Sequence, residues 1–220
     1  MEEFNFLTQN EISQIFEIFQ SANPNPQSEL TAPNAYTFLV AVVLSAQATD
    51  KSVNKATENL FKIVQTPKQM IELGEENLIS YIKSIGLYKA KAKHVIQLSH
   101  QLIENFDSDI PHTREELESL SGVGRKTANV VLNVVFGKPT MPVDTHILRI
   151  SQRIGFSDKT KPEEVEKDLV AKIPERFMMS AHHWLILHGR YVCTARNPKC
   201  CECIISKQCK KNGIEKETQK

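Results

Sequence analysis

The clearest chemical signal in this sequence is a group of cysteines near the C-terminal end, spaced C-x6-C-x2-C-x5-C at Cys193, Cys200, Cys203 and Cys209. All 5 cysteines of the chain lie in this segment, so they cannot form a disulfide framework that staples the whole fold. Four thiolates so close together indicate a metal centre, and zinc and iron–sulfur clusters both accept four cysteines. Only one short CxxC hook is present, and the wide flanking gaps favour an iron–sulfur cluster over zinc. We expect Cys201 to be a spare thiol, because adjacent residues seldom both ligate one tetrahedral centre.

A second signal is the segment LSGVGRKTA at 120–128. It predicts a short helix, a turn containing Gly122 and Gly124, and a second helix that begins near Arg125, which is a helix-hairpin-helix pattern. The glycines let backbone N–H groups approach a phosphate closely, and the N-terminus of the following helix favours an anion. The alternative is an ordinary connection between two helices, which the flanking apolar spacing and the basic pair disfavour.

Two titratable residues, one in this segment and one after it, are candidates for chemistry. Lys126 falls in the first turn of the predicted second helix, beside Arg125. Both the helix dipole and the neighbouring cation favour the neutral amine, which is the nucleophile that Schiff-base chemistry requires. The alternative is an ordinary exposed lysine. Asp144, in PVDTHILR at 142–149, is a natural N-cap. It could also serve a site if its second carboxylate oxygen points outward.

Helices must position these residues. Apolar side chains recur at helical spacing in 38–46, 78–85, 95–103 and 130–135, and Gly86 and Gly137 end two of these stretches. Capping boxes are expected at Thr8/Glu11, Thr66/Gln69, Thr113/Glu116 and Thr160/Glu163. No sustained alternation of period two is present. The sequence therefore predicts an all-α fold of about ten helices. We expect the histidines to hold local structure, namely His146, His182, His183 and His188.

Composition excludes several classes of protein. The chain has 220 residues, of which 40% are hydrophobic and 24% charged, with 8 Gly and 10 Pro. These values suit one large or two small globular domains and exclude a disordered or fibrous chain. No apolar run approaches the ~20 residues that a transmembrane helix needs, so no membrane partner is expected. The first residues, MEEFNFLTQN, lack both Arg and a long apolar stretch, so we expect no targeting peptide and a cytoplasmic location.

The net charge of +1 hides an uneven distribution. No Lys or Arg precedes Lys51, whereas six acidic residues do. Residues 51–220 therefore hold all 27 basic residues against 20 acidic ones, an excess of +7. An excess of this size is compatible with a nucleic-acid partner.

Together these motifs resemble the endonuclease III family, the helix-hairpin-helix DNA glycosylases with AP lyase activity. The resemblance covers nearly the whole chain, from LSAQATD at 44–50 and IGLYKAKA at 85–92 to the hairpin, VDTHILR and the cysteines. It implies two all-α lobes with a DNA-binding cleft between them. A six-helix barrel domain with the hairpin should occupy 28–138, and an iron–sulfur cluster domain should combine 1–27 with 139–220.

The resemblance also implies a reaction. Lys126 matches the lysine that attacks C1′ of a damaged nucleotide, expels the base and forms an imine, after which β-elimination nicks the strand. Asp144 matches the aspartate that assists deprotonation of the lysine and stabilises positive charge on the sugar. The expected partner is double-stranded DNA that contains oxidised pyrimidines or abasic sites, bound by a monomer that is associated with the nucleoid.

Further residues match the DNA-binding and metal-binding positions of the family. Gly122, Gly124 and Arg125 match the hairpin that grips the DNA backbone. Gln47 and Leu87 match residues that fill the gap and wedge the duplex when the base flips out, a step that costs a few kcal/mol. Their alternatives are a solvated loop amide for Gln47 and the apolar contact of a Gly86 helix cap for Leu87. The [4Fe–4S] ligands of the family match Cys193, Cys200, Cys203 and Cys209, which leaves Cys201 outside the set.

One departure from the family pattern is Ser121, which stands where the hairpin commonly has proline. We expect a less rigid turn there. Three other functions remain to be weighed. A monofunctional adenine glycosylase is disfavoured by the presence of Lys126. A non-catalytic DNA-binding module would use only the hairpin and the cluster. An electron carrier is disfavoured because about 190 residues precede the cluster without a second redox site.

Overall fold

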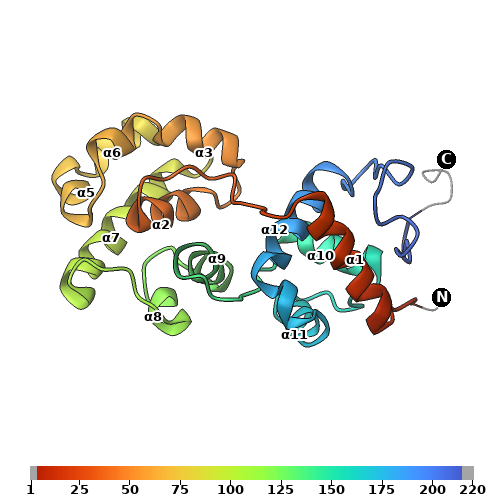
Figure 1. Ribbon diagram of the computed structural model, residues 1–220. Helices are drawn as coiled ribbons and strands as arrows, with labels where there is room; N and C mark the ends of the chain where they lie inside the picture. The colour runs from red at the N-terminus through yellow and green to blue at the C-terminus, as the bar shows by residue number, and fades with distance from the viewer. Residues whose placement is uncertain (1–3, 215–220) are drawn as a thin grey trace. The chain divides into compact units, whose positions relative to one another are not determined.

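The computed structural model describes residues 4–214, and within that range the chain is helical and contains no strand (Figure 1). The all-α prediction is therefore confirmed. Twelve helices are present among the described residues, two more than expected. None of them is long and apolar enough to cross a membrane. The chain separates into two compact units, Ser28–Lys138 and Met1–Gln27 with Pro139–Lys220.

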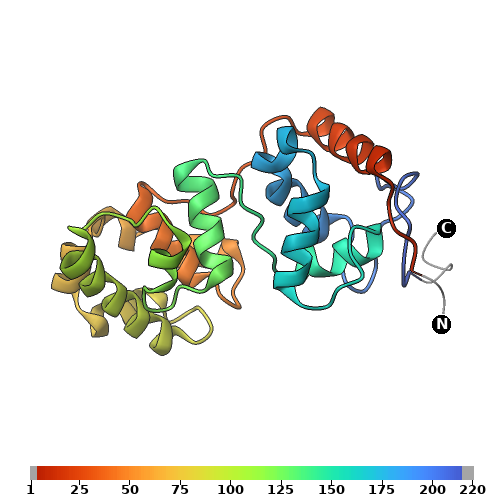
Figure 2. The same cartoon turned by 90° about the horizontal axis from the view of Figure 1, so that it is seen from below.

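The 28–138 unit is built around a helix that is buried on every side. Its helices are α2 (Ala35–Leu44), α3 (Asp50–Thr57), α4 (Leu60–Ile63), α5 (Pro67–Leu73), α6 (Glu75–Ile82), α7 (Tyr88–Phe106), α8 (Arg114–Glu118) and α9 (Arg125–Phe136). Every residue of α2 from Tyr36 to Leu44 is buried. Helices α7 and α9 pack against α2, and α5 and α6 pack against α7 (Figure 2). The apolar face expected in 38–46 is thus wider than a single stripe, because neighbours surround α2.

The other unit joins the N-terminal helix to the C-terminal part of the chain. It contains α1 (Gln9–Ala22), α10 (Thr145–Ile154), α11 (Pro162–Lys172) and α12 (Glu175–Tyr191). The ring of Phe16 in α1 lies 5.7 Å from that of Phe177 and 6.2 Å from that of Trp184, both on α12. After α12, residues 192–214 form turns without a further helix. This segment, which we call the cysteine loop, carries all 5 cysteines of the chain.

Of the four expected capping boxes, one is complete and two have only the bond to the threonine side chain. Thr8 and Glu11 form a complete capping box at the start of α1, and the Thr66 and Thr113 side chains accept the N–H of the residue three positions later. The expectation of a box at Thr160/Glu163 is wrong. Helix α11 has Lys161 as its N-cap and Pro162 as its first residue. Proline suits that first position, because its φ is already helical and its missing N–H would have no helical partner there.

Candidate active site and metal centre

The hairpin, residues 119–124, joins α8 to α9, which pack against each other. Gly122 has a φ of +77°, which L side chains rarely adopt, and a Cβ at this position would lie 2.8 Å from Cβ of His94 on α7. Gly124 differs, because its φ of −102° is ordinary and a Cβ there would meet nothing within 4 Å. Nothing in the part of the chain that the structure describes requires glycine at 124. Close approach of an outside molecule to the backbone would require it.

The N-terminus of α9 is suited to an anion. Its N-cap, Gly124, provides no side-chain cap, and the first turn contains no acidic residue. The first two residues of the helix are Arg125 and Lys126, both partly exposed. Backbone N–H groups, the helix dipole and two cations therefore point to the same kind of ligand, a phosphate. This geometry places the candidate lysine directly beside the candidate phosphate site.

Two loops of the same unit come together with strained backbones. Gln47 has a φ of 53° and Leu87 a φ of 59°, values in the left-handed region that cost a non-glycine residue of order 1 kcal/mol each. A Cβ at Gly86 would lie 4.0 Å from the carbonyl oxygen of Gln47, so the two loops are adjacent. Strain of this kind persists mainly at functional sites.

The exposure of Leu87 decides between its two interpretations. Its side chain is 61% exposed, and the residue itself is the N-cap of α7. It is therefore not the buried apolar contact of a helix cap. A large apolar side chain held outward on a strained backbone has the form expected of a wedge. Gln47 is also exposed.

Asp144 caps α10 in the unit that contains the cysteines, whereas Lys126 belongs to the 28–138 unit. Oδ1 of Asp144 accepts the backbone N–H groups of His146 and Ile147, each at 2.9 Å. Within residues 4–214, Oδ2 makes no hydrogen bond. The capping interpretation is confirmed, and it leaves the second oxygen available for another partner. That Asp144 and Lys126 face each other stays a prediction.

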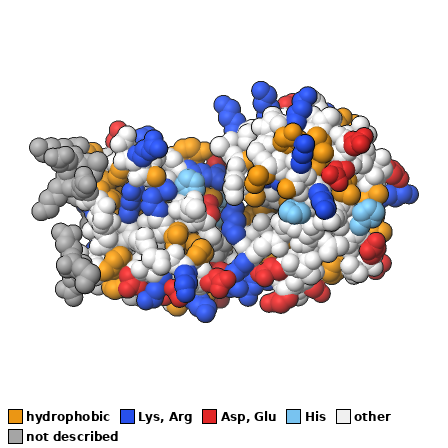
Figure 3. Space-filling view, turned by 180° about the vertical axis from the view of Figure 1, so that it is seen from behind, with side chains coloured by type: hydrophobic (Ala, Val, Ile, Leu, Met, Phe, Trp, Pro, Cys, Tyr) orange, Lys and Arg blue, Asp and Glu red, His pale blue; other side chains and the backbone are white. Residues whose placement is uncertain are grey.

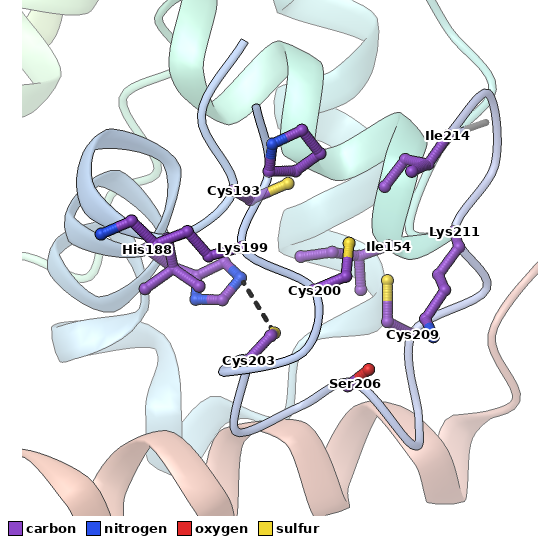
Figure 4. A pocket seen from close by; sticks show the side chains of 12 residues that line it. Ile154, His188, Cys193, Lys199, Cys200, Cys203, Ser206, Cys209, Lys211 and Ile214 are labelled. Carbon is purple, nitrogen blue, oxygen red and sulfur yellow. Dashed lines mark hydrogen bonds between the residues drawn. The ribbon is translucent and has the colours of Figure 1, made fainter. Parts of the chain in front are cut away.

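The cysteine loop, Ile154 of α10 and His188 of α12 line a pocket that is partly open to solvent (Figure 4). It is lined by the side chains of Cys193, Cys200, Cys203 and Cys209, whereas Cys201 is exposed and does not line it. The described residues contain no group of three or more His, Cys, Asp or Glu side chains gathered closely enough to hold a single ion. The four cysteine side chains nevertheless line one pocket, and both zinc and iron–sulfur centres accept four cysteine ligands.

Burial raises the pKa of the thiols of Cys200 and Cys203, and it raises that of Cys209 to about 11. The neighbouring thiolates raise the pKa values further. Cys193 is buried and the other three are partly buried, and four thiolates around one pocket would repel one another unless a positively charged group lay between them. The cavity therefore has the chemistry of a site for metal cations.

Three side chains that the sequence analysis did not single out as functional contact the cysteines of this pocket, and one of them, His188, also lines it. Arg153 donates from Nη1 to Sγ of Cys193 at 3.7 Å, and Nε2 of His188 lies 3.8 Å from Sγ of Cys203 (Figure 4). Arg149 donates from Nη2 to the carbonyl oxygen of Cys193 at 3.1 Å. The available signal was the four-residue spacing of Arg149 and Arg153, which places both on one face of α10. That His188 has only a local structural role stays a prediction.

The lysines that lie near Leu87, the candidate wedge, in the sequence are not all on the surface. Lys83, Lys89 and Lys93 are exposed, but Lys91 is only 4% exposed and its Nζ has no hydrogen-bond partner among the described residues. Burial lowers the pKa of Lys91. Lys91 therefore does not contribute to the charged surface beside Leu87, although lysine is exposed by default. On the face seen in Figure 3, Lys and Arg side chains occur on both units, interspersed with Asp and Glu.

The fold and the hairpin define a class of protein. Residues 40–175 match the family described as "HhH-GPD superfamily base excision DNA repair protein". An Endonuclease III of Treponema pallidum (strain Nichols) is 57% identical over 200 residues, which cover 91% of this chain and 95% of that protein. The Endonuclease III of Escherichia coli (strain K12) is 51% identical over 187 residues, 85% of this chain and 89% of that one.

A solved structure gives the same result. An endonuclease III trapped as a covalent intermediate with DNA, in an estranged-adenine complex, superimposes with a TM-score of 0.88 at 42% identity. The match covers 94% of this chain and 97% of that chain. This chain belongs to the endonuclease III family of the HhH-GPD superfamily.

Proposed function

We propose that Lys126 is the nucleophile of this protein, which is a DNA glycosylase with AP lyase activity. The observation that carries the proposal is the position of Lys126 at the N-terminus of α9, directly after the hairpin. A relative with 42% identity forms a covalent intermediate with DNA, and such an intermediate needs a nucleophile beside the bound backbone. The proposed substrates are duplex DNA with oxidised pyrimidines and DNA with abasic sites.

Lys126 takes part in two steps of the reaction, first as the nucleophile and then as the imine from which β-elimination occurs. The lone pair on Nζ of Lys126 attacks C1′, and the glycosidic bond breaks with its electron pair leaving on the base. Nζ gives up one proton after the attack, and its lone pair then forms the C1′=N bond of a protonated imine as the C1′–O4′ ring bond breaks and O4′ takes up a proton. Removal of a proton from C2′ then expels the 3′ phosphate by β-elimination, which nicks the strand, and water releases the lysine.

Asp144 is proposed as the carboxylate of this site. Its Oδ1 accepts two backbone N–H groups, and these two hydrogen bonds fix the orientation of the carboxylate and hence the position of Oδ2. A fixed carboxylate can accept a proton from the lysine and stabilise positive charge on the sugar. Its capping role makes it a rigid part of α10.

The remaining assignments follow the two units. We propose that 28–138 is the barrel domain, in which Gly122, Gly124 and Arg125 bind the DNA backbone and Gln47 and Leu87 take the place of the flipped base. The unit of 1–27 and 139–220 is proposed as the cluster domain; 1–3 and 215–220 lie outside the described residues. A DNA-binding cleft between the domains, a monomeric state and a cytoplasmic, nucleoid-associated location are parts of the same proposal.

The cavity is proposed to hold a [4Fe–4S] cluster through Cys193, Cys200, Cys203 and Cys209. The donor set fits, because four cysteines surround one space and no fifth sulfur lines it. A bound cluster would supply the cationic centre that four neighbouring thiolates need and would hold the cysteine loop together. Arg153 and Arg149 support the loop from α10 by their bonds to Cys193.

The nucleophile is tested by borohydride trapping on a duplex that contains an oxidised pyrimidine. Borohydride reduces the imine, so we expect a covalent adduct between protein and DNA. The adduct should vanish in Lys126→Ala and persist in Lys138→Ala, which removes another lysine of the same unit. If the wild-type protein gives no adduct, the lyase assignment is wrong and a monofunctional glycosylase becomes the better description.

The metal is tested by colour and composition. We expect purified protein to be yellow-brown and to contain iron and sulfide. Cys201→Ser should keep the colour, because Cys201 lies outside the cavity, whereas Cys203→Ser should lose it. Colourless protein that contains zinc would contradict the assignment.

A further inference from the structure

Ser121 in the hairpin makes two hydrogen bonds to α7. Its backbone N–H donates to Oε1 of Gln101 at 2.7 Å, and its Oγ donates to Oε1 of Gln97 at 2.9 Å. Gln101 also donates from Nε2 to the carbonyl oxygen of Ser119 at 3.1 Å. Gln101 therefore bonds to the backbone on both sides of Leu120, which is buried. The side chain of Gln101 thus holds the start of the hairpin, at Ser119 and Ser121.

A third side chain of α7 contacts the next residue of the hairpin. His94 lies against Gly122, so closely that a Cβ at 122 would be 2.8 Å from Cβ of the histidine. His94, Gln97 and Gln101 have the spacing i, i+3 and i+7, which places them on one face of the helix. One face of α7 thus supports consecutive residues of the hairpin.

The serine explains why this support is needed. Proline at this position would fix φ and would have no N–H, so it would need no acceptor. Serine has a freer backbone and an N–H that must find a partner once it is partly buried. Gln101 supplies that partner. Two hydrogen bonds thus stand where proline would have its ring, and the expectation of a less rigid turn stays a prediction.

We propose that Gln101, assisted by Gln97, is a positioning residue for DNA binding. It holds the hairpin in the conformation that presents the N–H groups of Gly122 and Gly124 to a DNA phosphate. A loop held in its binding conformation loses less entropy when the ligand arrives, so its affinity is higher. The proposal rests on the DNA-binding role proposed above for the hairpin.

The test separates binding from chemistry. A duplex with a tetrahydrofuran abasic analogue cannot form an imine, because its sugar carries neither a base nor a hydroxyl at C1′. Fluorescence anisotropy at one fixed salt concentration then gives Kd alone. We expect Gln101→Leu to raise Kd by about fivefold to tenfold, the usual effect of an unpaired, partly buried N–H. The first-order trapping rate on damaged DNA at saturation should change by less than twofold.

The matched control is Gln69→Leu. Oε1 of Gln69 accepts the backbone N–H of Gln65 at 2.8 Å, the same type of bond as that of Gln101, but it lies on α5. We expect this variant to leave Kd unchanged. If Gln101→Leu and Gln69→Leu give the same Kd, Gln101 has only a structural role and the proposal is wrong.

A rescue experiment completes the test. Adding Ser121→Pro to Gln101→Leu should return Kd to within about twofold of the wild-type value, because proline removes the unpaired N–H and fixes φ. A double variant that melts like the wild type but still binds weakly would overturn the proposal. If the wild-type protein itself neither binds the analogue nor gives a trapped adduct, the proposed function fails instead.

Discussion

The carboxylate of Asp144 divides its two oxygens between different surroundings. Oδ1 accepts two backbone N–H groups at the start of α10, and Oδ2 accepts none from the described part of the chain. A residue with this geometry can stabilise a helix and take part in a reaction without compromise. Its two contributions can be separated by substitution, because only one of them needs a charge.

We expect Asp144→Asn to keep stability and lose activity. Asparagine is as good an N-cap as aspartate, so the melting temperature should change little. Without the carboxylate, the trapping rate should fall about 100-fold or more, the usual contribution of a general base. Asp144→Ala should lose the same activity and also about 0.5–2 kcal/mol of stability with the cap. An Asp144→Asn variant that traps DNA at the wild-type rate would show that the carboxylate is not used.

At the scale of elements, α7 connects two of the proposed DNA-binding features. Its N-cap is Leu87, the candidate wedge, and Gln97 and Gln101 further along the helix hold the hairpin. At 1.5 Å per residue, Gln101 lies about 20 Å from Leu87 along the helix axis. A straight helix therefore fixes the separation between the wedge and the hairpin.

Helix starts offer a direct test of the element boundaries. Thr113 accepts the N–H of Glu116 at the start of α8, whereas Thr160 precedes the N-cap of α11 and makes no hydrogen bond within 4–214. We expect Thr113→Ala to lower the free energy of unfolding by about 1 kcal/mol and Thr160→Ala to have almost no effect. Chemical denaturation of both variants measures the difference. Equal losses would mean that α11 begins at Thr160 after all.

Local patterns explain which elements were predictable from the sequence. Apolar spacing and Thr caps depend only on neighbours along the chain, so they indicated most helices correctly. The grouping of the four cysteines around one cavity was also predictable, because their spacing is short. Contacts between distant residues were not, such as Ser121 with Gln101 and Arg153 with Cys193. The burial of Lys91 was missed for the same reason, since lysine is exposed by default.

At the scale of the whole molecule, an ion pair ties α1 to the end of the cysteine loop. Nζ of Lys210 lies 2.6 Å from Oε1 of Glu11, and both side chains are about three-quarters buried. The hydrogen bond from Lys210, followed by that from the backbone of Thr8, lowers the pKa of Glu11 from 4.5 to about 2. The folded-state pKa is the lower one, so the ionised carboxylate stabilises the fold above pH 4.5. This contribution is lost as the pH falls from 4.5 towards 2.

We therefore expect Glu11→Gln to lower the melting temperature at pH 7. Glutamine keeps the capping box but not the charge, so the loss reports the ion pair. The difference between the variant and the wild type should shrink at pH 3, where part of the Glu11 contribution is already lost. The control is Glu17→Gln on the same helix, which breaks a more exposed pair with Arg176 and should cost about 0.5 kcal/mol or less. A Glu11→Gln effect that is equal at both pH values would contradict the pKa assignment.

The use of both chain ends in one unit has a consequence for biosynthesis. The 28–138 unit is complete as soon as residue 138 has left the ribosome, so it can fold while synthesis continues. Helix α1 is made first, yet the side chains that cover its apolar face, on α10 to α12, are made last. Until then Ile12, Ile15, Phe16 and Phe19 have no native partners outside their own helix. Helix α1 thus reaches its place only after α10 to α12 have been made, and a nascent chain that stalls after residue 138 exposes it to chaperones and proteases.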